Sequence, residues 1–280
     1  MLNFNGILHD HTEDSLHNNR AFLYGDGVFD TLKIVNDTIL FLEDHYFRLM
    51  ASMRIVRMEI PMNFTIEFFE KEILNLAKAN VCNDSARVRF TVYRNTGGYY
   101  LPEHNTVSYV ITASKLENRA YQIADAPYEV ELYKDFYVSK QLLSTIKTTN
   151  KMIHITGSIF ANENGYSNCL LINENKNIVE ALQGNLFMFT GKELVTPPVT
   201  EGCLNGIMRK QVLALARKIE DIEVVERPVS PFDLQKADEL FITNVITGIQ
   251  PITKYRKKEY DQVLANDLLI RLNRLINQIR

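Results

Sequence analysis

Apolar residues recur at helical spacing in several long segments of this chain. We predict five helices, over residues 43–58, 65–80, 151–164, 207–220 and 260–280. The first opens with Glu43 and Asp44, where the helix dipole favours acids, and the third ends at Gly165, a residue suited to a helix stop. The last carries a core-facing stripe of Val263, Leu264, Leu268, Leu272, Leu275, Ile276 and Ile279.

Strands are predicted where apolar and β-branched residues form short runs between turn residues. Residues 24–34 form a glycine turn and an extended segment, and Asp37 then turns the chain into a second strand over residues 39–42. Further strands are expected over residues 86–94, 107–114, 168–172, 178–182, 186–190, 223–227 and 240–243. Helices and strands alternate without an internal repeat, which favours a mixed α/β fold.

The pattern weakens after residue 115, and we place a domain boundary there. The chain has 280 residues, more than the commonest domain size, so two domains are expected. We predict an N-terminal α/β domain over residues 1–117, a linker over residues 118–126 and a C-terminal α/β domain over residues 127–280.

Charge and composition narrow the class of partner. A formal net charge of -3 gives no electrostatic reason to expect nucleic acid or a membrane surface, so a small-molecule substrate is expected. No segment approaches the ~20 apolar residues of a membrane helix, and no secretory leader precedes the first strand, so a cytoplasmic location is expected. Cys82, Cys169 and Cys203 lie far apart and suggest neither a disulfide framework nor a thiolate metal site.

Histidines near the N-terminus raise the question of a metal site. His9, Asp10, His11 and His17 lie close together in the sequence, but no helical motif with metal-ligand spacing accompanies them. Histidine on an exposed loop is common, so we predict no metal site.

Lys147 is the first candidate for chemistry. It lies among small hydroxyl residues in the segment 144–150, and a desolvated lysine amine can act as a nucleophile. Taken alone the signal is weak, because the chain has 31 lysines and arginines. Further along, Glu180 lies in a strand-like run and Gly206 precedes a helix whose first amides can bind an anion. A lysine, a buried acid and helix-end amides are the parts that a pyridoxal phosphate site requires.

Several motifs in the same order resemble the class IV (fold type IV) pyridoxal-phosphate enzymes. They are Y-G-D-G-V-F at residues 24–29, H-Y-F-R-L at residues 45–49 and Q-P-I at residues 250–252. This family comprises branched-chain and D-amino-acid aminotransferases and 4-amino-4-deoxychorismate lyase. The resemblance implies a two-domain α/β fold with pyridoxal 5'-phosphate at the domain interface.

The resemblance also implies roles for individual residues. Lys147 would form a Schiff base with the cofactor and act as general base, and Glu180 would keep a proton on the pyridine nitrogen. The other cofactor-binding residues would be Arg48, Asn185, Leu204, Ile207, Met208, Asn244 and Val245. Without the resemblance, Arg48 is equally well a surface arginine and Glu180 a solvent-facing strand residue.

Three departures from the aminotransferase pattern favour the lyase branch. Residues 206–209 have G-I-M-R where the aminotransferases usually have G-I-T-R, and Asn244 stands where they tend to carry threonine. The loop at residues 93–98 lacks the R-x-H carboxylate clamp of D-amino-acid aminotransferases. The candidate substrate contacts are Phe29, Arg89, Arg94 and Tyr100.

We therefore expect a 4-amino-4-deoxychorismate lyase, which forms 4-aminobenzoate and pyruvate for folate precursor synthesis. The alternative is a class IV aminotransferase acting on branched-chain or D-amino acids, and a third hypothesis is a non-catalytic carrier of the cofactor. The resemblance also implies a homodimer in which the loop at residues 95–100 reaches the active site of the partner.

Overall fold

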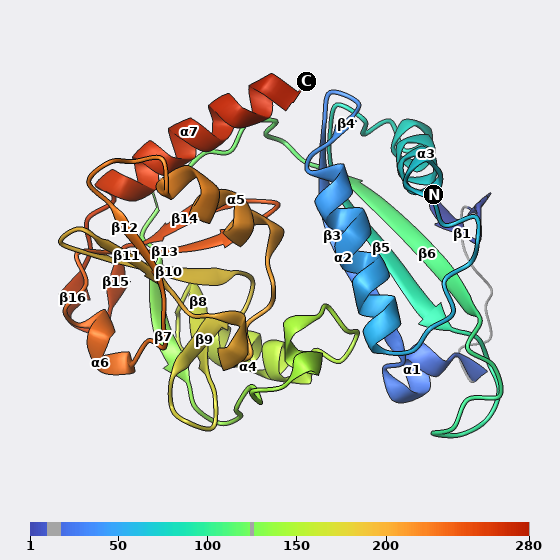
Figure 1. The fold of residues 1–280 in the computed structure, drawn as a ribbon, viewed down its shortest axis with the longest axis horizontal. Coiled ribbons are helices and arrows are strands. Elements are labelled where there is room, and N and C mark those ends of the chain that lie inside the picture. The colour runs from blue at the N-terminus through green and yellow to red at the C-terminus, as the bar shows by residue number, and fades with distance from the viewer. Residues whose placement is uncertain (10–17, 124–125, 280) are drawn as a thin grey trace. The chain divides into compact units, whose positions relative to one another are not determined.

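The computed structural model describes residues 1–9, 18–123 and 126–279. The chain divides into two compact units, each of which mixes helices and strands (Figure 1). The first unit is Met1–Arg119 with Ile146–Asn150, and the second is Ala120–Thr145 with Lys151–Arg280. Within the described residues, no helix has both the length and the apolar character needed to cross a membrane.

The first unit is built on an antiparallel sheet of six strands in the order β2-β1-β6-β5-β3-β4. The strands are β1 (Leu2–Phe4), β2 (Ile7–His9), β3 (Gly27–Val35), β4 (Thr38–Ile39), β5 (Ser85–Arg94) and β6 (Val107–Lys115). The helices of this unit are α1 (Arg20–Tyr24), α2 (Leu42–Ile55) and α3 (Ile66–Ala79).

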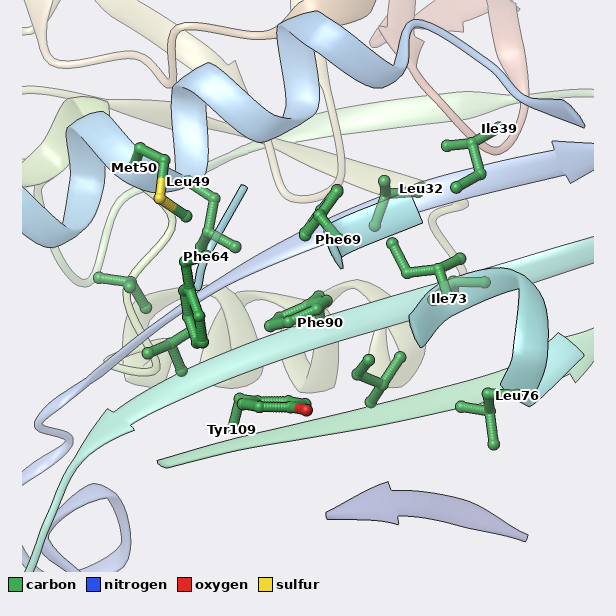
Figure 2. Close-up of a cluster of buried hydrophobic side chains, with 14 of the residues drawn as sticks. Leu32, Ile39, Leu49, Met50, Phe64, Phe69, Ile73, Leu76, Phe90 and Tyr109 are labelled. Atoms are coloured by element: carbon green, nitrogen blue, oxygen red, sulfur yellow. The ribbon is translucent and has the colours of Figure 1, made fainter. Parts of the chain in front are cut away.

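Apolar side chains of α2 and α3 pack on this sheet and form the core of the first unit. Leu49 of α2 and Phe69 and Ile73 of α3 belong to one buried cluster with Leu32 and Phe90 of the sheet (Figure 2). Burying a side chain of this size stabilises a fold by about 1.5–3 kcal/mol relative to leaving it exposed. The cluster therefore fixes β3 and β5, the two strands that carry Phe29, Arg89 and Arg94.

The segment Ile146–Asn150 belongs to the first unit, although the sequence analysis assigned it to residues 127–280. Phe29 N donates to the carbonyl of Lys147 at 2.8 Å, and Thr149 N donates to the carbonyl of Gly27 at 2.9 Å. The segment thus pairs with the start of β3 through an antiparallel bridge between Val28 and Thr148. A pairing of residues so far apart in the sequence leaves no local pattern.

The second unit contains two sheets of five strands, in the orders β12-β11-β10-β13-β14 and β16-β15-β7-β8-β9. The strands of the first of these sheets are β10 (Asn185–Thr190), β11 (Glu193–Thr196), β12 (Glu223–Glu226), β13 (Glu239–Asn244) and β14 (Gly248–Ile252). Those of the other sheet are β7 (Glu129–Tyr133), β8 (Asn168–Ile172), β9 (Ile178–Ala181), β15 (Lys254–Tyr255) and β16 (Lys258–Glu259). The helices are α4 (Met152–Glu163), α5 (Ile207–Ala216), α6 (Pro231–Leu234) and α7 (Val263–Ile279), with single 3-10 turns at Leu142–Thr145 and Val199–Glu201.

Helix α7 packs against α5 and strand β14 of this unit (Figure 1). The predicted stripe is buried at Leu264, Leu268, Leu272 and Ile276. Val263 was also placed in the stripe, but it is exposed, because it begins the helix one position away from the buried row. The buried carboxylate of Glu239 accepts from the N–H groups of Leu264 and Ala265 and so caps this helix.

All five predicted helices are present, and the differences lie at their ends. Helix α5 stops at Ala216 instead of residue 220, because the chain continues in turns in which Lys218 N donates to Leu215. The strand predicted over residues 39–42 is also shorter. Phe41 adopts a left-handed conformation and Leu42 already begins α2, so β4 ends at Ile39. The predicted linker is partly built into the second unit, where Tyr121 is buried.

Candidate active site

Lys147 lies beside an aromatic ring in the first unit. Its Nζ is 5.0 Å from the centroid of the Phe29 ring, and the Arg89 guanidinium carbon is 3.6 Å from the same centroid. Arg89 Nε donates to Thr91 Oγ1 at 3.1 Å, and burial together with neighbouring Arg87 lowers the pKa of the guanidinium. An amine and a planar donor group thus share one apolar surface, as in a cation–π arrangement.

Arg48 is fixed by a buried carboxylate next to Phe29. Asp30 on β3 accepts from Arg48 Nε at 2.9 Å and from Arg48 Nη2 at 2.5 Å, and His45 Nδ1 lies 2.9 Å from the same carboxylate. Burial acts to raise the pKa of Asp30, but Arg48 and His45 outweigh it and hold that pKa well below its usual range. The carboxylate is therefore ionised at neutral pH and sets the orientation of the guanidinium.

His45 is neutral in this cluster. Burial and the charges of Arg48 and Lys147 lower the pKa of its imidazole, and together they outweigh the Asp30 carboxylate, which raises it. A neutral ring that donates from Nδ1 has an acceptor at Nε2. This Nε2 atom is buried and has no hydrogen-bond partner among the residues that the structure describes.

In the second unit, Glu180 and Asn185 hold both backbone groups of Leu204. Glu180 is buried on β9 and accepts from Leu204 N at 2.9 Å, while Asn185 Nδ2 donates to the Leu204 carbonyl at 2.8 Å. The other Glu180 oxygen lies 3.5 Å from Nε2 of His154 on α4. This arrangement, which we name the Leu204 clamp, fixes the loop that leads into α5.

The N-terminus of α5 follows the Leu204 clamp directly. Gly206 is the N-cap residue and no side chain caps the helix, whose first two residues are Ile207 and Met208. A Cβ atom on Gly206 would lie 1.9 Å from Oδ1 of Asn185, so only glycine fits here. Uncapped N–H groups at a helix start form an anion-binding site, and the helix dipole favours negative charge there.

The end of β13 carries the last group of predicted cofactor residues. Oδ1 of Asn244 accepts from Ile246 N and from Thr247 N, both at 2.9 Å, and the Val245 carbonyl accepts from the Tyr121 hydroxyl at 2.6 Å. The side-chain oxygen of Asn244 thus shapes its own turn. Beside it, the hydroxyl of Thr243 is buried without a hydrogen-bond partner among the described residues.

Comparison with known proteins decides the family. The family model described as "Amino-transferase class IV" matches residues 27–255, which is most of the chain. The chain belongs to the class IV aminotransferase family. It is therefore an enzyme of a family that uses pyridoxal phosphate, as the sequence motifs predicted.

Individual relatives come from both branches of the class IV family. A Methanocaldococcus jannaschii protein named "Putative branched-chain-amino-acid aminotransferase" is 28% identical over 93% of this chain and 89% of its own. The aminodeoxychorismate lyase of Vibrio harveyi is 23% identical over 84% of each chain. The crystal structure of a branched-chain aminotransferase from Thermoproteus uzoniensis has a TM-score of 0.87 at 22% identity, covering 98% of this chain and 94% of that chain. This similarity confirms the predicted fold-type-IV α/β architecture.

The class IV cofactor fits the chemistry of the residues present. Pyridoxal phosphate needs an amine for its aldehyde, an acid for its ring nitrogen and donors for its phosphate. Lys147 is a half-buried amine against an apolar ring, Glu180 is a buried carboxylate, and α5 begins without a cap. A phosphate dianion also requires hydrogen-bond donors. Two further donors are the Arg48 guanidinium, which Asp30 holds, and the Thr243 hydroxyl, which has no partner among the described residues.

Two predicted substrate residues of this class IV enzyme have other contacts. Arg94 is buried, and it donates to Asp26, to the carbonyls of Arg57 and Val56 and to the Asn105 side chain. Its guanidinium therefore belongs to the scaffold of the neighbouring loop, and we do not propose a substrate contact for it. Tyr100 is 90% exposed, and the centroid of its ring lies 5.7 Å from the centroid of the Tyr24 ring.

Sequence reasoning missed several residues that shape the site. Asp30 directly follows the motif at residues 24–29, and His45 opens the motif at residues 45–49, of which only Arg48 was singled out. His154 lies seven positions after Lys147, and nothing in the sequence indicates that it faces Glu180. Buried Arg20, on the short helix α1, was also missed. One signal could have identified the cluster of Asp30, His45 and Arg48, which we call the Asp30 cluster. An acid on a strand is followed by a histidine and an arginine three positions apart on a helix.

The N-terminal histidines fall mostly outside the described residues. Asp10, His11 and His17 lie there, so the structure does not test the prediction made for them. Within the described part of the chain, no group of three or more His, Cys, Asp or Glu side chains could hold a metal ion.

Proposed function

We propose that the protein is a 4-amino-4-deoxychorismate lyase, which converts its substrate to 4-aminobenzoate and pyruvate. In this proposal Lys147 binds the cofactor and then serves as the base, and Glu180 holds the proton of the pyridine nitrogen. Ile207, Met208 and Arg48 bind the phosphate, while Asn185 and Leu204 support the ring. Asn244 and Val245 shape the turn beside the phosphate.

The chemistry of each residue follows from its surroundings. Pyridoxal phosphate, when bound, supplies an electron sink that acidifies the substrate carbon carrying the amine. The amine of Lys147 takes that proton, and Phe29 beside it keeps water away from the reacting carbon. Loss of enolpyruvate from the adjacent carbon makes the ring aromatic, and a proton returned to enolpyruvate gives pyruvate.

The observation that supports the lyase over the aminotransferase is the set of hydrogen bonds that Arg94 makes within the protein. An amino-acid aminotransferase must hold the carboxylate on the reacting carbon of every substrate, whereas that carbon of aminodeoxychorismate carries none. The loop at residues 95–100 contains no cation, and the arginine that precedes it is engaged with Asp26 and backbone carbonyls. This loop therefore suits a substrate without such a carboxylate.

One observation favours the second candidate, a class IV aminotransferase. Arg89 lies on the Phe29 ring that Lys147 also contacts, and its planar donor fork suits a carboxylate. In the lyase, Arg89 would bind a carboxylate remote from the reacting carbon. In an aminotransferase acting on branched-chain or D-amino acids, it would bind the carboxylate next to the amine.

A product assay separates the two candidates. The holoenzyme is incubated with aminodeoxychorismate alone, and separately with a panel of branched-chain and D-amino acids plus 2-oxoglutarate. Formation of 4-aminobenzoate and pyruvate in equal amounts, without a 2-oxo acid acceptor, is expected. Turnover of amino acids with no 4-aminobenzoate would overturn the lyase in favour of the aminotransferase. A lack of any turnover would favour the carrier.

We also propose that the active form is a homodimer. The first unit exposes Phe22, Phe47 and Tyr99, and α4 of the second unit exposes Met152 and Ile155. Aromatic residues and methionine are enriched at protein interfaces. The predicted cytoplasmic location stays a prediction.

A further inference from the structure

Arg20 is buried in the first unit and binds a loop far from it in the sequence. Its Nη1 donates to the carbonyls of Gly97, Gly98 and Tyr99 at 2.9, 3.3 and 2.7 Å. The Arg20 side chain is only 3% exposed, so these charge-assisted bonds form away from water. One guanidinium thus donates hydrogen bonds to three successive carbonyls of the loop at residues 95–100.

Asp26 links Arg20 to the strand that enters the same loop. Oδ2 of Asp26 accepts from Arg20 Nε at 2.9 Å and from Arg94 Nε at 3.0 Å. Arg94 also donates to Asn105 Oδ1, on the segment that leaves the loop. Both ends of the loop and its middle are therefore tied to one network of two arginines and one carboxylate, which we call the Arg20 network.

The loop itself is tightly folded but its side chains face solvent. Gly97 and Gly98 have positive φ angles of 118° and 69°, and a Cβ on Gly98 would lie 2.2 Å from the Leu101 carbonyl oxygen. Tyr99, Tyr100 and Leu101 are 83%, 90% and 85% exposed. These side chains contribute little core of their own, so the backbone of the loop depends on Arg20 for its conformation.

We infer that Arg20 is a positioning residue, which presets the loop at residues 95–100 for substrate binding. The inference rests on the proposed function and on the predicted substrate contact of Tyr100 in this loop. Preorganisation removes the entropic cost of ordering the loop when substrate binds. Loss of the Arg20 network should therefore weaken substrate binding while the groups around Lys147 and Glu180 continue to act.

Two variants test this inference. Arg20→Gln removes the charge and the fork, and Arg20→Lys keeps a charge for Asp26 but cannot present a planar fork to three carbonyls. We expect KM to rise on the order of tenfold in Arg20→Gln with kcat nearly unchanged. Binding of the substrate and of the transition state should weaken equally, and such a loss raises KM alone. Arg20→Lys should lie between this variant and the wild type.

Limited proteolysis reports on the loop without any substrate. Chymotrypsin cleaves after tyrosine, and cleavage after Tyr99 or Tyr100 requires the loop backbone to open locally. We expect fragments from these sites to appear several times faster in both Arg20 variants than in the wild type. Mass spectrometry identifies the cleaved bonds.

Arg119→Gln is the matched control, because Arg119 makes a two-pronged pair with Asp84 in the same unit but both side chains are about half exposed. It should change neither KM nor the cleavage rate. Unchanged cleavage in Arg20→Gln, or faster cleavage with an unchanged KM, would overturn the inference. The proteolysis result is independent of the reaction, and KM is measured on whichever substrate turns over, so failure of the lyase assignment gives a different outcome.

Discussion

At the scale of single residues, buried charges in this protein are satisfied by specific partners. Asp30 binds Arg48 and His45, and Glu180 binds the Leu204 N–H group with His154 nearby. Burying a charge is costly unless it is paired and hydrogen-bonded. Each of these carboxylates therefore fixes the position of the groups around it as well as its own.

Lys147 is expected to be indispensable for the reaction. Lys147→Ala should lower kcat by more than about 10³-fold, because the nucleophile and the base are lost together, while phosphate contacts still retain some cofactor. Borohydride treatment of the wild-type holoenzyme and peptide mapping should find the pyridoxyl group on Lys147. The exposed Lys134 is the control, and Lys134→Ala should remain active. A pyridoxyl group on any other lysine would contradict this prediction.

Replacing Glu180 should affect the rate much more than the fold. In Glu180→Gln the amide oxygen can still accept from Leu204 N, so the melting temperature should barely change. A neutral amide cannot keep the pyridine proton in place, and we expect kcat to fall on the order of 100-fold. Steady-state kinetics and cofactor absorbance of the purified variant provide the measurement. Near wild-type turnover in a variant that binds cofactor would rule out this role.

Asp30 should make stability depend on pH. Its pKa is depressed in the folded state, so its contribution is fully present above the unfolded value of about 3.9 and is lost as the pH falls further. Asp30→Asn should cost about 3–5 kcal/mol at pH 7, because Arg48 loses its buried partner. The difference from wild type should shrink below pH 4.

Urea unfolding followed by far-UV circular dichroism measures this effect, since the chain contains no tryptophan. Asp221→Asn is the control, because Asp221 pairs with Lys192 on the surface and both side chains are largely exposed. It should change stability by less than about 0.5 kcal/mol. An equal loss in Asp30→Asn at pH 7 and pH 3.5 would show that the charge of Asp30 is not the cause.

At the scale of elements, the start of α5 is shaped by contacts from two strands. Glu180 on β9 and Asn185 on β10 form hydrogen bonds with the backbone of Leu204. Gly206 follows, at a position where a Cβ atom would clash with Asn185. The Leu204 clamp holds the loop before α5, and no side chain caps the helix itself. The first N–H groups of α5 remain available for an anion because the loop is held from outside the helix.

Gly206→Ala should disturb this element and with it the cofactor phosphate. Its Cβ would overlap Oδ1 of Asn185, and overpacking of this kind costs about 1–3 kcal/mol. We expect a lower melting temperature and weaker binding of pyridoxal phosphate, measured by fluorescence titration. Combining the change with Asn185→Ala removes the clash, so the double variant should lose less than the sum of the two single effects. Strict additivity would show that the two side chains do not meet.

At the scale of the whole molecule, the two units contribute different chemistry. The first unit carries Lys147, Arg89 and the Asp30 cluster, and the second carries the Leu204 clamp and the start of α5. Neither set alone contains an amine, an acid for the ring nitrogen and an uncapped helix. The proposed function therefore draws on residues of both units.

The homodimer gives a prediction at this scale. If each active site needs the loop at residues 95–100 of a partner, dilution should dissociate the subunits and lower the specific activity in parallel. Analytical ultracentrifugation of the holoenzyme at assay concentration, with activity measured on the same samples, tests this. Added cofactor serves as a control for cofactor loss on dilution. A monomer with full activity would exclude the dimeric site.

The sequence by itself determined most of the elements and the family. Apolar spacing located five helices, and alternation located strands such as residues 86–94, because local periodicity records which face of an element is buried. The motifs at residues 24–29, 45–49 and 250–252 identified the family, which the comparison confirmed. These features depend on residues that are close together along the chain.

Only the tertiary structure decided which polar groups meet. Arg48 lies in a predicted helix and Arg94 ends a predicted strand, and both were candidate site residues. In the structure Arg48 binds Asp30, whereas Arg94 belongs to the Arg20 network. Arg20 and Gly97 are 77 positions apart, and Asp30 and Arg48 are 18 apart. The segment Ile146–Asn150 likewise joins β3 through backbone bonds to distant residues. Periodicity carries no information on such pairs, because the partner of a buried polar group is set by how the elements pack.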